Sequence, residues 1–225
     1  MKKSIGIAAV LLLLLVSCKT DKKEILPTPP QPELTLLEKI AQANGYEEWK
    51  NVNELKFTFN VDKDSTHFER TWTWKPKINE VSSITADTTI TYLRKNLDST
   101  LTKTDASFIN DKYWLLAPFQ LVWDAKSFEF THTVESEAPI SKKPMQKLTI
   151  VYKNEGGYTP GDAYDFYFGA NFILQEWVFR KENQEEPSMT TTWEDYETIN
   201  GIKFAKSHKM EGQNFNLNFT GIQIN

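Results

Sequence analysis

From Asn53 to the C-terminal end of the chain, large apolar side chains recur at every second position. The first run of such residues is Leu55, Phe57, Phe59 and Val61. The same period returns in residues 68–74, 88–92, 148–152, 164–168, 173–179 and 193–219. Alternate side chains of a β-strand point to opposite faces, so the pattern predicts strands with one apolar and one polar face. Such strands are typical of antiparallel sheets.

Turn motifs separate these runs. Gly156-Gly157, Gly169-Ala170-Asn171 and Asn200-Gly201 supply residues that tolerate positive φ, as tight hairpin turns require. The apolar positions are odd-numbered up to Phe219 but even-numbered from Ile222 onward. This change of phase near Gly221 predicts a bulge or a bend.

A large sheet with one apolar face must cover that face, either by closing into a barrel or with helices. We therefore predict a mainly β protein with a few helices: a curved antiparallel half-barrel of about ten strands, with helical segments covering the concave face. Apolar residues at helical spacing from Leu34 to Ala41, followed by Asn44-Gly45, predict one short helix. The segment Asp111–Trp123 is dense in apolar residues but contains Pro118, so we expect a helical turn or two, a break, and an apolar segment that plugs the concave side.

The N-terminal residues have the layout of a secretory signal. Lys2 and Lys3 precede an apolar run that ends in Leu15-Val16-Ser17-Cys18. This tetrapeptide resembles the bacterial lipobox, which implies cleavage before Cys18 and acylation of that cysteine. The resemblance also implies an outer-membrane lipoprotein of a Gram-negative envelope, because Lys19 rather than aspartate follows the cysteine. The alternatives are a plain secretory signal and a transmembrane anchor, for which the run is short against the roughly 20 residues that a spanning helix needs.

The expected organisation is a signal peptide at 1–17, a lipidated N-terminus and Pro-rich linker at 18–33, and a single half-barrel domain at 34–225. Four prolines between residues 27 and 32 favour extended backbone in the linker. Removal of the first 17 residues leaves 208 and shifts the formal net charge from −4 to −6. A chain with no basic stripe is not expected to bind nucleic acid.

Several motifs resemble an uncharacterised lipoprotein family, a domain of unknown function common in Bacteroidota. They are Tyr113–Phe119, Thr159-Pro160-Gly161, Trp177, Thr192–Tyr196 and Asn200–Ile202. The layout is also distantly similar to the half-barrel lipoprotein-sorting chaperones of the Lol system, in architecture rather than in matching residues. The second similarity implies helices across a concave sheet and an apolar cavity for acyl chains. The first family supplies no catalytic residues.

The sequence contains no persuasive catalytic or metal-binding motif. His67, His132 and His208 are far apart in polar surroundings, and we interpret them as solvent-exposed strand positions. There is no paired-histidine zinc motif, nucleophile elbow, P-loop or dinucleotide motif. The acidic residues of segment 182–186 are typical of a solvated hairpin tip. We therefore predict a protein that is not an enzyme and uses no cofactor and no metal.

The aromatic residues are the strongest functional lead, since the chain has seven Trp and fourteen Phe. The candidates for the wall of a ligand cavity are Trp72, Trp74, Tyr92, Trp114, Phe119, Trp123, Phe166, Phe168, Trp177, Phe179 and Trp193. An alternative of equal weight is that these rings simply fill the core. Arg70 and Gln175 interrupt apolar faces and are candidate anchors for a polar head group, although we favour a buried structural pair or an edge position for each.

These observations predict an envelope lipoprotein without catalytic activity that binds a lipid, an acyl chain or another apolar ligand in the concave cavity. Trp114, Phe119 and Trp123 are the expected lid or plug. The alternative is a structural or accessory subunit of an outer-membrane complex with a self-filled core. The expected partners are the membrane, through acylated Cys18, a lipid or apolar small molecule, and in the alternative an envelope protein; the body would face the periplasm or the cell surface.

Overall fold

The computed structural model describes residues 33–85, 88–155 and 158–225. The chain divides into Met1–Glu33 and Leu34–Asn225, and the description below concerns the second unit. The predictions for the signal peptide, for Cys18 and for the Pro-rich linker fall outside the described residues.

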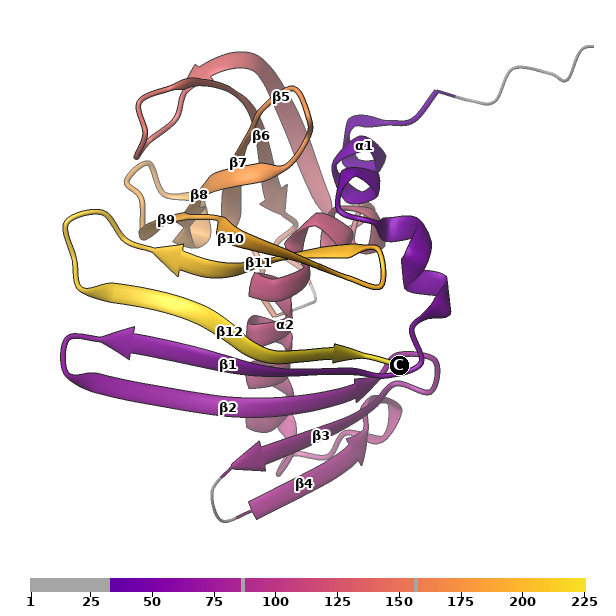
Figure 1. Ribbon diagram of the computed structural model, residues 1–225. Coiled ribbons are helices and arrows are strands. Elements are labelled where there is room, and N and C mark those ends of the chain that lie inside the picture. Colours follow the sequence, from indigo (N-terminus) through magenta and orange to yellow (C-terminus); the bar gives the residue numbers. More distant parts are fainter. Residues whose placement is uncertain (1–32, 86–87, 156–157) are drawn as a thin grey trace, which may run out of the picture. The chain divides into compact units, whose positions relative to one another are not determined.

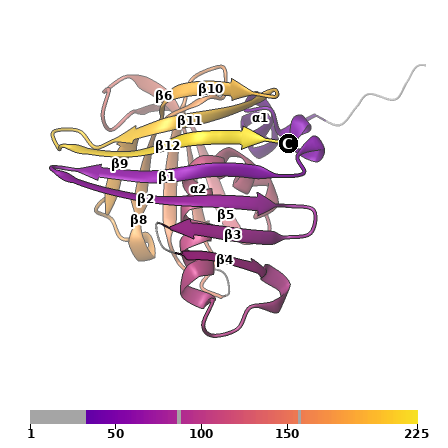
Figure 2. The ribbon, with the colours of Figure 1, turned by 60° about the horizontal axis from the view of Figure 1, so that its bottom comes forward.

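Twelve strands form two antiparallel sheets (Figure 1). The first sheet has the order β10-β11-β12-β1-β2-β3-β4, visible face-on in Figure 2, and the second has the order β5-β6-β7-β8-β9. The strands of the first sheet are β1 (Leu55–Lys63), β2 (Thr66–Lys75), β3 (Glu80–Thr85), β4 (Thr88–Leu93), β10 (Glu194–Ile199), β11 (Ile202–Lys209) and β12 (Phe215–Ile224). Those of the second are β5 (Phe128–Glu137), β6 (Pro144–Tyr152), β7 (Ala163–Phe168), β8 (Leu174–Arg180) and β9 (Met189–Thr192).

The predicted class, mainly β and antiparallel with helices on the concave side, is confirmed. The division into two sheets is an addition to the prediction. It occurs at Trp193, the single residue between β9 and β10. The Trp193 N–H still donates to the Gln175 carbonyl of the second sheet, at 2.7 Å. The adjacent Thr192 already contacts the first sheet, because its hydroxyl oxygen accepts from the Lys209 N–H at 3.0 Å.

The predicted N-terminal helix is present as α1 (Leu36–Ala43). The Thr35 hydroxyl and the Glu38 carboxylate form a reciprocal capping box that satisfies free N–H groups at the start of the helix. Leu37, Ile40 and Ala41 form its buried face. A 3₁₀ helix, η1 (Tyr46–Asn51), follows directly.

Gly45 joins α1 to η1 and lies against the turn between β10 and β11. Its φ is 88°, in the left-handed region that glycine tolerates best. A Cβ atom at this position would lie 2.1 Å from the Gly201 carbonyl oxygen. The Lys203 N–H donates to the Asn44 carbonyl at 2.9 Å, which holds the two turns together. The predicted Asn44-Gly45 stop and the predicted Asn200-Gly201 turn are therefore packed on each other.

The long helix α2 (Thr102–Trp123) enters after a short 3₁₀ turn, η2 (Arg94–Asn96). Leu116 has non-helical angles (φ −121°, ψ 21°) two residues before Pro118. Proline removes one backbone hydrogen bond and clashes with the preceding turn, which explains the kink. The expected break is thus present, but the helix starts at Thr102 rather than near Asp111, and it resumes after the kink.

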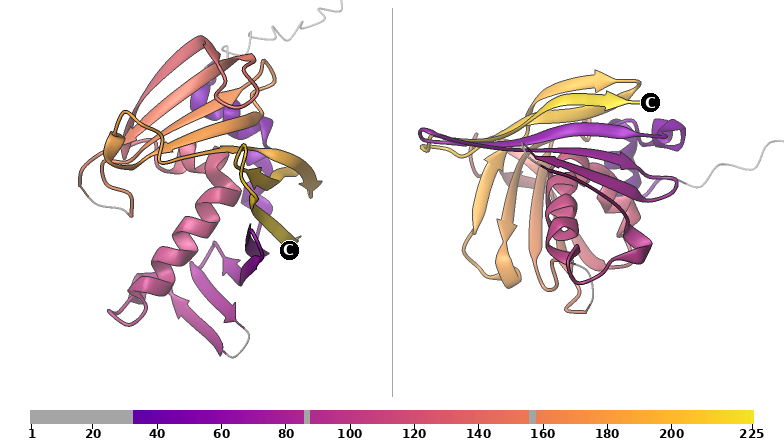
Figure 3. Two further views of the ribbon diagram at one scale, coloured as in Figure 1. Left: turned by 90° about the vertical axis from the view of Figure 1, so that its left-hand side faces the viewer. Right: turned by 90° about the horizontal axis from the view of Figure 1, so that it is seen from below.

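Helix α2 lies in the angle between the two sheets (Figure 3). Every residue from Asp111 to Leu121 is buried, on all sides of the helix. A helix that is apolar all round is typical of a fully surrounded core element. The predicted plug of the concave side is therefore the C-terminal two thirds of α2, packed between two sheets rather than laid across one.

Two bulges interrupt the regular ladders. Between β1 and β12, the partners of Lys56 and Thr58 are Gln223 and Thr220, so one extra residue lies near Gly221. This confirms the predicted phase change. A second irregularity lies between β7 and β8, where Gln175 is left without a partner residue.

Among the described residues, no helix is both long enough and apolar enough to cross a membrane.

Candidate ligand-binding cleft

A cleft of about 1080 Å³ runs along α2 between the helix and the two sheets. Its wall is formed by α2, by β1, β2 and β12 of the first sheet, and by β6 to β9 of the second. The sheets place these side chains by ordinary alternation, since each strand directs every second residue toward α2. The volume matches the upper part of the range for small-molecule sites, about 300–1,000 Å³.

Five of the eleven predicted cavity residues line the cleft: Trp74, Trp114, Trp123, Trp177 and Phe179. The other six belong to the core and do not line it: Trp72, Tyr92, Phe119, Phe166, Phe168 and Trp193. The sequence could not separate the two groups, because core and cavity residues both point inward along the strands. The position of the long helix decides which inward faces stay open.

Trp114 forms the closest aromatic contact in the wall. Its ring centroid lies 4.2 Å from that of Trp177 on β8. It also lies 5.3 Å from the ring centroid of His208 on β11. Trp114 therefore joins the helix to both sheets.

His208 is completely buried, so the prediction that it is solvent-exposed is wrong. Its ring packs against Trp114, Trp193 and Phe219. Burial lowers its pKa to about 3, so the ring is neutral at physiological pH. The reason is the crossing of the chain at Trp193, which covers this part of β11. His67 and His132 are exposed, as expected.

Arg70 forms a two-pronged ion pair with Asp111, not an open anchor. Its Nε and one terminal nitrogen each donate to the Asp111 carboxylate at 2.9 Å. The Trp72 Nε1 donates to the same carboxylate at 2.8 Å. This is the buried structural pair considered above as the alternative for Arg70, and it fastens α2 to β2.

Arg94 makes the equivalent attachment at the start of α2. Two of its nitrogens donate to Asp105, at 2.7 and 3.0 Å. The hydroxyls of Tyr92 and Tyr158 donate to the same carboxylate. Burial acts to raise the pKa of Asp105, but the hydrogen bonds from Arg94 and Tyr158 outweigh it and lower the pKa below its ordinary value.

Gln175 does not face the cleft. It is exposed at the bulge of β8, where Leu174 and Glu176 take the paired positions. The extra residue shifts the alternation, so the predicted shared face of Gln175 and Trp177 does not form.

Lys112 is the residue that sequence reasoning missed. It lies on the buried part of α2, lines the cleft, and is only 6% exposed. Its Nζ donates to the Gln120 side-chain oxygen at 3.3 Å. Burial lowers its pKa to about 8. A signal was present, because a helix through this segment places Lys112 one turn after the apolar Phe108.

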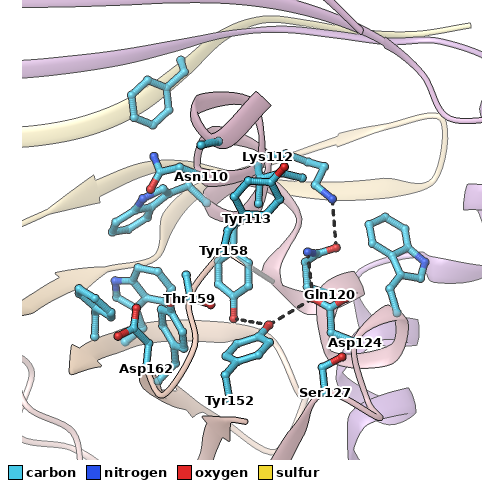
Figure 4. Close-up of a pocket in the computed structure, with 18 of the residues that line it drawn as sticks. Asn110, Lys112, Tyr113, Gln120, Asp124, Ser127, Tyr152, Tyr158, Thr159 and Asp162 are labelled. Carbon is cyan, nitrogen blue, oxygen red and sulfur yellow. Dashed lines mark hydrogen bonds between the residues drawn. The ribbon is translucent and has the colours of Figure 1, made fainter. Parts of the chain in front are cut away.

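A row of hydrogen bonds continues from Gln120 across the wall (Figure 4). Gln120 Nε2 donates to Asp124 at 3.2 Å, and the Tyr152 hydroxyl donates to the same carboxylate oxygen at 3.2 Å. Tyr152 also lies 3.5 Å from the Tyr113 hydroxyl. The cleft thus combines aromatic surface with one confined polar row, an arrangement suited to an amphiphilic ligand. Among the described residues, no group of three His, Cys, Asp or Glu side chains is placed to hold a metal ion.

Comparison with known proteins finds no matching family model and no match among curated proteins. Solved structures do match. A LolA superfamily protein from Nitrosomonas europaea aligns with a TM-score of 0.50 and 9% identity, over 84% of this chain and 92% of that one. A DUF1329 family protein from Desulfovibrio piger aligns with a TM-score of 0.49 and 10% identity, over 84% and 92%. At such identities only the fold is comparable, and the fold of this chain is similar to that of the LolA superfamily protein.

Proposed function

We propose that this protein is an envelope lipoprotein that holds a lipid or an acyl chain in the cleft beside α2, without catalysing a reaction. The single observation that carries the proposal is the open aromatic cleft of about 1080 Å³ along a helix that is otherwise tightly packed. A core that only served stability would be filled to a density that leaves few voids larger than a water molecule.

The driving force for binding would be burial of hydrocarbon against the rings. Each methylene group removed from water contributes about 0.8 kcal/mol. Trp74, Trp114, Trp123, Trp177 and Phe179 supply the surface for this contact. The similar fold of the LolA superfamily protein supports the proposal as an analogy of architecture.

Photo-crosslinking tests where a ligand binds. The protein lacking residues 1–18 is incubated with a long-chain fatty acid that carries a diazirine on its terminal carbons, irradiated, and digested for peptide mapping. The proposal predicts labels on α2, β8 and the segment around Tyr152. Labels scattered over the exposed faces of the sheets would contradict it.

Attachment to the membrane is a separate part of the proposal and has its own test. Metabolic labelling with a palmitate analogue should mark the wild-type protein and not Cys18→Ser. An equal label on both would mean that the cysteine is not the acylated residue. The outer-membrane position and the side that the body faces are then read from fractionation and from protease treatment of intact cells.

The alternative, an accessory subunit with a self-filled core, draws support from the six predicted cavity residues that lie in the core. It predicts a ligand-free protein that the fatty acid does not label in the cleft.

A further inference from the structure

We propose that Lys112 binds the anionic group of the ligand, a carboxylate or a phosphate, while the apolar chain of the same molecule lies against the aromatic wall. This inference rests on the proposed function and narrows it, because it assigns an anionic amphiphile rather than a neutral lipid to the cleft.

The surroundings of Lys112 form a box of aromatic rings. Its Nζ lies 5.2 Å from the ring centroid of Trp74, 5.5 Å from that of Trp123 and 6.0 Å from that of Phe108. Ring faces attract a cation, but each such contact replaces only part of the lost hydration. Trp74 and Trp123 also line the cleft, so the ammonium group and the apolar wall belong to one continuous surface.

The charge of Lys112 is not compensated in the way that its cationic neighbours are. Arg70 and Arg94 each hold a carboxylate with two hydrogen bonds. Among the described residues, Lys112 has one hydrogen bond, to the neutral amide oxygen of Gln120, and no ion pair. An ammonium group has three donors, so two of them are available to a ligand.

A buried charge is costly unless it is paired. The nearest acidic group along the polar row is Asp124, and Gln120 lies between it and Lys112. Asp105 is already bound by Arg94 and two tyrosines. A ligand carboxylate or phosphate at Nζ would supply the missing partner and form short charge-assisted hydrogen bonds.

The geometry also explains how such a site stays selective. The ammonium group is 6% exposed and lies inside the cleft, so a small anion gains no burial there, whereas an amphiphile gains both the ion pair and the apolar contact. Burial lowers the pKa of Lys112 to about 8, so the ammonium form still predominates at neutral pH and can form this pair.

The test compares three molecules with the same chain: dodecanoate, dodecyl phosphate and dodecanol. Binding at pH 7 is followed by tryptophan fluorescence and by calorimetry, on the protein lacking residues 1–18. We expect wild-type protein to bind at least one of the two anions about tenfold or more tightly than dodecanol. Whichever anion binds more tightly identifies the head group as carboxylate or phosphate.

Lys112→Met keeps a linear apolar side chain in the box and should reduce the affinity for the anions to that for dodecanol, while leaving dodecanol binding unchanged. Lys103→Met is the matched control, since Lys103 is exposed on the same helix. It should change none of the affinities. Lys112→Gln serves as a second variant, so that a folding defect in one substitution does not decide the outcome.

Two results would overturn the assignment to Lys112. One is equal affinity of the wild-type protein for all three molecules, and the other is a preference for anions that persists in Lys112→Met and Lys112→Gln. If the wild-type protein bound none of the three, the proposed function itself would fail, so the two failures are distinguishable.

Discussion

Trp114 on α2 and Trp177 on β8 pack with their ring centroids 4.2 Å apart and their planes at 60°. This contact joins the helix to the second sheet. On its other side, α2 is joined to the first sheet by the Arg70–Asp111 and Arg94–Asp105 ion pairs. The helix is therefore held by charge on one side and by aromatic packing on the other, and the cleft follows the aromatic side.

Trp114→Ala should reduce ligand retention more than it reduces stability, because Trp114 lines the cleft as well as packing in the core. Trp193→Ala is the matched control. Trp193 contacts the same two rings, Trp177 and His208, but does not line the cleft. Both truncations are expected to cost about 3–5 kcal/mol in the free energy of unfolding, measured by urea denaturation.

Affinity for a bound fatty acid distinguishes the two variants. The account predicts a loss for Trp114→Ala and near wild-type affinity for the folded fraction of Trp193→Ala. Equal loss of affinity in both variants would mean that Trp114 is a core residue only.

Asp111→Asn should destabilise the fold strongly. The substitution keeps the shape of the side chain but leaves Arg70 without its counter-charge next to a carboxamide that is 0% exposed. Removal of one partner of a buried pair costs about 3 kcal/mol or more. Glu80→Gln, which breaks the more exposed pair with Lys75, should have a much smaller effect. Comparable denaturation midpoints for the two variants would show that Asp111 is not an essential attachment of α2.

Lys112→Met should be more stable than the wild-type protein at pH 7. The folded-state pKa of about 8 lies below the ordinary value of 10.5, so the folded protein bears the full cost of the buried charge below pH 8. This cost decreases as the pH rises from about 8 to 10.5, because the folded protein releases the proton first. We expect an advantage of about 1–3 kcal/mol for the variant at pH 7.

The advantage of Lys112→Met should shrink in denaturation experiments at pH 9 and 10. Lys103→Met controls for the loss of a lysine in general. A stability difference that does not vary between pH 7 and 10 would contradict the burial of an uncompensated charge at Lys112.

Gly45→Ala should destabilise the protein through two effects, the positive φ and the contact with the Gly201 carbonyl. Gly212→Ala separates them, because Gly212 has a φ of 68° but no atom within 4 Å of an added Cβ. The first effect costs about 1 kcal/mol. Thermal unfolding should show a clearly larger loss for Gly45→Ala; an equal loss would mean that the contact between the turns relaxes without cost.

Much of the fold was predictable because alternation, turns and caps are local. The apolar face of α1, the strands and the bulge at Gly221 all follow from neighbouring residues. The early part of α2 was not predicted, since residues 102–110 are mixed polar and apolar and the later proline suggested a shorter helix. The division into two sheets depends on one crossing residue, Trp193, which no local pattern marks.

The site was predictable only in part. Trp114 and Trp177 were found because they are large and inward-facing, but the same property describes Phe166 and Trp193 in the core. The role of Lys112 depends on three rings that come from β2 and from both ends of α2. The burial of such a lysine is a tertiary property, which the sequence pattern of one segment cannot express.

Native mass spectrometry with organic extraction tests the central claim most directly. The protein lacking residues 1–18 is purified from a lysate that contains membranes, and its mass is compared before and after extraction. The account predicts a bound molecule of lipid size that is lost in Trp114→Ala. A ligand-free mass that stays unchanged when lipids are added would contradict the account and favour an accessory subunit with a filled core.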